Sequence, residues 1–127
     1  MKFESINAFY ICNYDVTIKG AKGLGFDSTG VESRSLLFPI QILDQIILED
    51  EMLRFRYLDD KETYVAELTS SDDLAYKGRV SLGDYSFDLE LTHFKVNEDS
   101  GFHLFFGKWV EGDRSQEFVV KCRKVDE

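Results

Sequence analysis

Two histidines, His93 and His103, flank a short polar segment, residues 97–101, whose composition is typical of a turn. If the flanking strands pair with Val96 opposite Phe102, the two imidazoles lie diagonally on one face of a hairpin. At that separation both rings are just within reach of one shared metal ion. No carboxylate or thiolate is clearly aimed at the same face, so we expect two ordinary sheet histidines and no metal site.

A glycine-rich stretch, residues 20–25, has the composition of a phosphate-binding loop, in which backbone N–H groups and a lysine contact phosphate. Its glycine spacing matches neither the Walker nor the dinucleotide-binding pattern, and no amphipathic helix follows it. We therefore interpret the stretch as part of a Gly-rich loop at residues 20–35, the longest connection in the chain, and expect no cofactor.

Motifs of known catalytic families are missing from the sequence: neither G-x-S-x-G nor H-E-x-x-H occurs. The two cysteines, Cys12 and Cys122, follow no metal-ligand spacing and have no histidine beside them in the sequence. They are either small reduced core residues or close neighbours on the first and last strands of a closed sheet. Although an active site assembled from distant residues stays open, the sequence favours a protein that is not an enzyme.

Carboxylates gather at two predicted turns, the first containing Glu49, Asp50 and Glu51 and the second containing Asp59 and Asp60. Together they would form a negative rim that attracts a basic partner. The alternative is that these charges only keep a β domain soluble and protect the edges of its sheet.

The strand predicted over residues 102–109 is apolar on both faces. Alternate positions place three apolar side chains on one face: Phe102, Leu104 and Phe106. The other face carries Phe105 and Trp109, with Gly107 leaving space between them. We expect this strand to be covered on both sides, but if one face is open, Phe105 and Trp109 are the natural anchors for a partner or an apolar ligand.

The composition sets limits on the class of protein. The 127 residues suit one domain, 1–127, and the net charge of -9, from 15 basic and 24 acidic residues, argues against binding to nucleic acid or to an anionic membrane. No apolar run is long enough to span a bilayer, and residues 1–9 lack the pattern of a signal peptide. We therefore expect a cytoplasmic protein.

Alternation of apolar and polar residues with a period of two dominates the chain, as in residues 53–57 and 85–92. Short polar connectors such as Gly83-Asp84 suit tight hairpin turns. The sequence therefore predicts an all-β protein, an antiparallel meander of about seven to nine strands that forms a small barrel or a two-sheet sandwich. Residues 39–48 have isoleucines at helical spacing, yet their Ile content favours a strand.

Two functions follow from these observations. The first is a non-catalytic acidic protein-binding domain, such as an inhibitor, an immunity-type protein or an adaptor, that engages a basic partner through Glu49, Asp50, Glu51, Asp59 and Asp60. The alternative is a carrier of a small apolar ligand, with a barrel cavity lined by aromatic side chains that include Phe105 and Trp109. The oligomeric state is left open.

Overall fold

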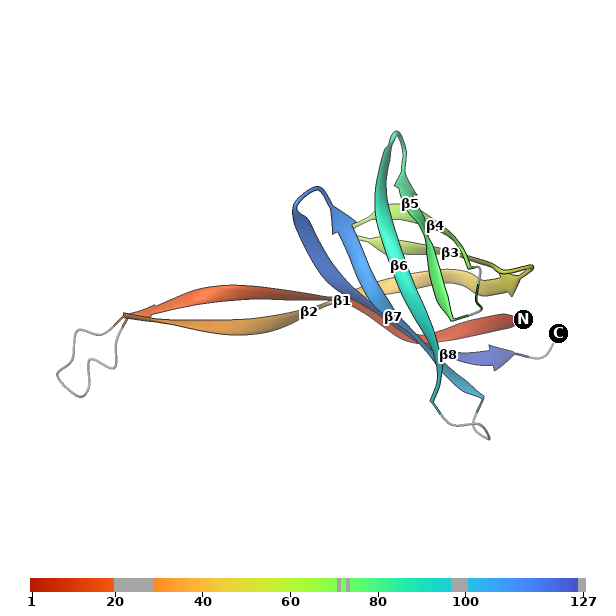
Figure 1. Cartoon of the computed structure of the whole chain (residues 1–127), viewed down its shortest axis with the longest axis horizontal. Coiled ribbons are helices and arrows are strands. Elements are labelled where there is room, and N and C mark those ends of the chain that lie inside the picture. The colour runs from red at the N-terminus through yellow and green to blue at the C-terminus, as the bar shows by residue number, and fades with distance from the viewer. Residues whose placement is uncertain (20–28, 71, 73, 97–100, 126–127) are drawn as a thin grey trace.

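The protein is a closed barrel of eight antiparallel strands in which each strand pairs with its neighbours in the chain and β1 also pairs with β8 (Figure 1). The computed structural model describes residues 1–19, 29–70, 72, 74–96 and 101–125, and the side chains of these residues except 13–19, 29–34 and 114. The strands are β1 (Lys2–Lys19), β2 (Thr29–Glu49), β3 (Met52–Asp59), β4 (Glu62–Thr69), β5 (Ala75–Leu82), β6 (Tyr85–Lys95), β7 (Phe102–Glu111) and β8 (Arg114–Val125).

This architecture confirms the predicted all-β antiparallel meander and decides in favour of the barrel over the sandwich. Residues 39–48 lie within β2, so the preference for a strand in this segment is also confirmed. The predicted two-residue turn at Gly83-Asp84 joins β5 to β6, where Leu82 pairs with Tyr85 and Gly83 has a φ of 57°. Among the described residues, no helix is long and apolar enough to cross a membrane.

Side chains at alternate positions fill the barrel interior, as the period of two requires. Four of the largest fully buried side chains are Phe3, Tyr57, Phe105 and Phe118. Aromatic rings contact one another across the interior with centroid separations of about 5 to 6 Å, for example 5.5 Å between Tyr57 and Phe118. The interior of the described barrel is therefore a packed core of aromatic and aliphatic side chains.

Gly107 stands where the backbone of β6 approaches β7 closely. A Cβ atom at this position would lie 1.6 Å from the carbonyl oxygen of Glu90. The space that the glycine leaves is thus occupied by the neighbouring strand, and only glycine fits here.

Beyond the barrel, β1 and β2 continue as a two-stranded ribbon that projects away from the other strands (Figure 1). The last pair between β1 and β8 is Ile11 with Glu117, and the last pair between β2 and β3 is Gln41 with Leu58. We call residues 12–19 of β1 and residues 29–38 of β2 the β-arm. Its strands pair from Cys12 with Leu36 to Lys19 with Thr29.

The β-arm corrects one prediction. Residues 29–35, expected to belong to the loop at 20–35, form the first part of β2, while residues 20–28 lie outside the described part of the chain. The prediction was wrong because a Gly- and Ser-containing segment has little strand propensity of its own. Here the segment is extended because it pairs residue by residue with β1.

The two cysteines are both free, and they lie at different heights of the barrel. Cys122 is buried and pairs with Ser5, whereas Cys12 is half-buried at the base of the β-arm and pairs with Leu36. The expectation that the first and last strands are adjacent is confirmed, but the register separates the two thiols. Burial raises the pKa of the Cys122 thiol to about 12, so this group is protonated at neutral pH.

Candidate functional site

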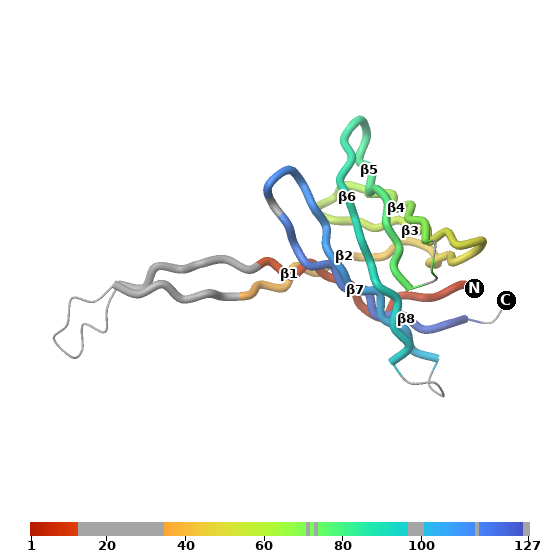
Figure 2. Tube along the Cα trace, viewed as in Figure 1, coloured from red at the N-terminus to blue at the C-terminus, as the bar shows by residue number. Residues whose placement is uncertain are grey.

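The turn between β2 and β3, at Glu49, Asp50 and Glu51, lies at the end of the barrel that also holds the N-terminus and the end of β8 (Figure 2). The β-arm leaves from the opposite end (Figure 1). All three carboxylates are exposed to solvent. Asp50 and Glu51 have positive φ values of 51° and 64°, the left-handed pair of a tight hairpin turn of the I′ type. This turn fixes the backbone from which the three acidic side chains project at the rim.

Backbone hydrogen bonds attach this turn to the segments on either side of it. The N-terminal ammonium of Met1 donates to the carbonyl of Leu48, and the Leu48 N–H donates to the carbonyl of Met1, both at 2.8 Å. The Ser70 N–H donates to the carbonyl of Glu51 at 2.9 Å. The turn is therefore braced by β1 on one side and by the end of β4 on the other.

A pocket of about 560 Å³ opens beside this turn, and we call it the acidic pocket. The residues that line it come from four regions of the chain: Met1, Leu48, Glu49, Asp50, Glu51, Leu74, Tyr76, His93 and Lys95. Leu48 and Tyr76 are buried, and Leu74 offers an exposed apolar surface. Three carboxylates stand against the ammonium of Lys95 and the N-terminus, which is already bonded to Leu48.

The loop that carries Leu74 is shaped by Asp72. Its carboxylate accepts hydrogen bonds from the N–H groups of Leu74 at 3.0 Å and Ala75 at 3.1 Å, and from the hydroxyl of Ser70 at 3.1 Å. These bonds lower the pKa of the Asp72 carboxyl below its usual value. Sequence reasoning missed Leu74 and Tyr76 as pocket residues, and the only signal was the Ser- and Asp-rich turn that precedes them.

His93 lines the acidic pocket and contacts His103. The Nε2 atom of His93 lies 2.7 Å from the Nδ1 atom of His103, with the rings stacked at 4.9 Å, and His93 pairs with Phe105 as the predicted register required. Phe105 stacks on His93 at 4.7 Å, and Phe3 packs edge-on against His103 at the same distance.

The environment keeps both imidazoles neutral. Burial, followed by His103 and Lys95, lowers the pKa of His93 to about 4. Burial, followed by Lys95 and Lys124, also lowers the pKa of His103. One ring therefore donates its hydrogen to the other, and among the described residues no three histidine, cysteine, aspartate or glutamate side chains gather around a metal-sized space.

Asp59 and Asp60, the other predicted partner-binding residues, lie at the opposite end of the barrel. They belong to the turn between β3 and β4, separated from the Glu49–Glu51 turn by the whole length of β3. The structure therefore does not join the five acidic residues into one rim. Burial, together with the charges of Asp60 and Glu62, raises the pKa of the Asp59 carboxyl.

Aromatic rings close the barrel at that end. The hydroxyls of Tyr10 and Tyr57 are hydrogen bonded to each other, and the rings of Tyr57 and Tyr64 stack at 5.0 Å. Trp109 packs on Phe87 at 4.9 Å. Of the two predicted ligand anchors, Trp109 lies in this aromatic end with 9% of its surface exposed, whereas Phe105 is 1% exposed and stacks on His93 instead. Of the buried side-chain nitrogen and oxygen atoms in the described residues, only Trp109 Nε1 has no hydrogen-bond partner.

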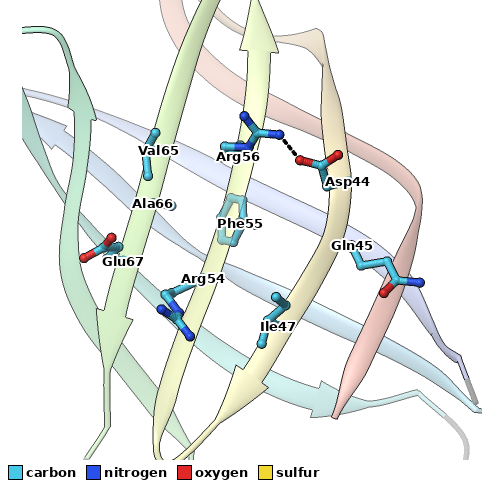
Figure 3. Close-up of a pocket in the computed structure, with 9 residues that line it drawn as sticks. All are labelled: Asp44, Gln45, Ile47, Arg54, Phe55, Arg56, Val65, Ala66 and Glu67. Atoms are coloured by element: carbon cyan, nitrogen blue, oxygen red, sulfur yellow. Dashed lines mark hydrogen bonds and ion pairs between the residues drawn. The ribbon is translucent and has the colours of Figure 1, made fainter. Parts of the chain in front are cut away.

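A second hollow, of about 320 Å³, lies on the outer face of β2, β3 and β4 (Figure 3). It forms where β2 bulges away from β3 between the pairs Leu43–Arg56 and Ile47–Arg54. Asp44, in the bulge, has a φ of 54° and forms an ion pair with Arg56. Its lining contains acidic and basic side chains in equal number, so its charge favours no class of ligand.

Comparison of the chain with family models, with curated proteins and with solved structures gives no match. The functional argument therefore rests on the geometry of the acidic pocket.

Proposed function

We propose that this protein is a non-catalytic binding domain that engages a basic partner protein, and that the acidic pocket receives a lysine or arginine side chain of that partner. One observation carries the proposal: three exposed carboxylates stand around a hollow of about 560 Å³ that has an apolar floor. The aliphatic stem of a basic side chain packs on such a floor while its cationic end reaches the carboxylates.

The charge of the whole chain supports the same proposal. A net charge of -9 attracts a basic protein over a distance of about one Debye length, and the pocket provides a specific contact at the end of that approach. The braced turn lowers the entropic cost of binding, because the backbone that carries Glu49, Asp50 and Glu51 is already held by the bonds of Leu48 to Met1 and of Glu51 to Ser70.

The test uses the separation of the two acidic turns. A triple variant, Glu49→Gln, Asp50→Asn and Glu51→Gln, removes the pocket charges with little change in shape, and the double variant Asp59→Asn and Asp60→Asn is the matched control at the other end. All three proteins are used to capture proteins from a cell lysate at low and high salt, and captured proteins are identified by mass spectrometry.

We expect one basic protein to be captured at low salt by the wild type and by the control, and to bind the triple variant about tenfold more weakly. Its association rate, measured by stopped flow, is expected to fall steeply as ionic strength rises. Equal affinity of the triple variant, or an association rate that is indifferent to salt, would contradict the proposal.

A second candidate function, the carrier of a small apolar ligand, is favoured only by Trp109 Nε1, a buried donor without an acceptor. Such a donor is satisfied by a ligand that brings one acceptor atom into the aromatic end. Native mass spectrometry of the purified protein tests this directly. A mass equal to that of the bare chain, together with Trp109 fluorescence that does not respond to apolar probes, would eliminate the carrier.

A further inference from the structure

The β-arm has one face that continues the barrel interior into solvent. Ile40 is buried in the core, and the alternation of β2 places Phe38 and then Leu36 on the same side of the strand. Across the ribbon, Phe38 pairs with the buried Tyr10 and Leu36 pairs with Cys12, which packs against the core.

Inside the barrel the opposite strands cover this face, whereas in the β-arm they do not. Phe38 is 45% exposed and Leu36 is 43% exposed, although both are large apolar side chains. A two-stranded ribbon is only marginally stable in water by itself, so this face requires a cover.

The charges in the sequence indicate what covers it. The net charge of the segment 12–38 is zero, because it contains three acidic and three basic residues: Asp15, Asp27 and Glu32 against Lys19, Lys22 and Arg34. The whole negative charge of -9 therefore belongs to the rest of the chain. A basic partner is attracted to the barrel, and the β-arm offers it no electrostatic attraction.

We propose that the β-arm is a self-association element, in which the face of Leu36 and Phe38 packs against the same face of a second copy of this chain. A second copy supplies a complementary apolar surface by two-fold symmetry. Arms that meet in this way hold the two acidic barrels at the outer ends of the dimer, where their repulsion is smallest.

Packing of face against face is favoured over pairing of strand edges. Pro39, at the barrel side of the β-arm, has no N–H group to donate to an added strand. The outer edge of β2 is thus interrupted at the point where a new ladder would join the barrel.

Sedimentation velocity over a range of micromolar concentrations tests the proposal, with the wild type and three variants. Phe38→Glu places a charge on the proposed contact face. Phe94→Glu is its matched control, since Phe94 is a phenylalanine on β6 with 47% of its surface exposed. Leu37→Glu changes the other face of the β-arm, where Leu37 is 60% exposed.

We expect the wild type to form a dimer. Phe38→Glu should weaken the dimer affinity about tenfold or more, whereas Phe94→Glu and Leu37→Glu should leave it unchanged. A wild type that stays monomeric at every concentration would overturn the proposal. A dimer weakened equally by Phe94→Glu would also overturn it, and a dimer lost only in Leu37→Glu would overturn the assigned face.

Salt dependence gives a readout that needs no variant. Screening of the repulsion between two barrels should strengthen the dimer as salt rises, whereas it should weaken capture of a basic partner at the acidic pocket. A dimer that weakens with salt contradicts association through neutral arms. Because the two effects have opposite signs and arise at opposite ends of the barrel, failure of one proposal leaves the other intact.

Discussion

The two ends of the barrel share one kind of turn but differ in what lies beneath it. At one end Asp50 and Glu51 adopt the left-handed conformation, and at the other Asp60 and Lys61 do so, with φ values of 48° and 67°. Both turns are acidic, and both connect to the same strand, β3. The local conformation and charge of a turn therefore do not decide whether a pocket forms beside it.

The inward side chains decide it. Beside the Glu49–Glu51 turn, Leu48, Tyr76 and His93 do not fill the space, and a hollow of about 560 Å³ is left. Beneath the Asp59–Glu62 turn, Tyr57, Tyr64 and Trp109 stack and pack until the end is closed. The aromatic end should therefore contribute more to stability, and the pocket end more to binding and to pH dependence.

The largest effect is expected at the aromatic end. Phe118→Ala removes a fully buried ring that contacts Tyr10, Phe55 and Tyr57, and should lower the free energy of unfolding by about 3–5 kcal/mol. Urea unfolding measures this loss, with Phe94→Ala, at an exposed site, as the control. A loss below about 1 kcal/mol would show that the ring core is not what stabilises this end.

A smaller loss is expected from the buried hydroxyl pair. Tyr57→Phe deletes one hydroxyl and leaves that of Tyr10 buried without its partner, which should cost about 1–3 kcal/mol. Tyr85→Phe is the control because Tyr85 is 72% exposed. If both substitutions have the same small effect in urea unfolding, the pair does not contribute to stability.

The stability that the pocket end contributes should decrease in acid. His93 is neutral in the folded protein because its pKa is lowered to about 4, whereas the unfolded chain takes up a proton near 6.5. The contribution of His93 to the free energy of unfolding is therefore complete above pH 6.5. As the pH falls towards 4, the free energy of unfolding decreases by about 1–2 kcal/mol after allowance for solvent screening. The slope of unfolding free energy against pH should flatten in the double variant His93→Gln and His103→Gln, and an unchanged slope would contradict this assignment.

The smallest effect has the opposite sign and arises at the aromatic end. The pKa of Asp59 is raised by burial and by its acidic neighbours. Its contribution to the free energy of unfolding is therefore complete in acid and is lost as the pH rises through that raised pKa. Asp59→Asn should therefore increase stability at neutral pH, by no more than about 0.5 kcal/mol because the group is partly exposed. Thermal unfolding at neutral and acidic pH measures it, and a decrease at neutral pH would refute the sign.

The sequence predicts many of the residues of the candidate site, but it does not show that they lie close together. The Val96 N–H donates to the carbonyl of Phe102, as the predicted pairing requires, and the same register puts His103 beside His93. The acidic turn at Glu49–Glu51 is also where the sequence predicts it. In contrast, the contributions of Leu74 and Tyr76 depend on how β5 meets β6 near the barrel rim, which no local pattern specifies.

The sequence by itself determined the strands and their turns, because alternation and turn chemistry act over only a few neighbouring residues. Tertiary structure alone decided three things: that β1 closes on β8, that the two acidic turns lie at opposite ends, and that residues 29–35 extend β2 into the β-arm. The physical reason is that each of these depends on pairing between segments far apart in the chain. The hydrogen bonds and buried rings that fix such pairing appear only when the barrel is closed.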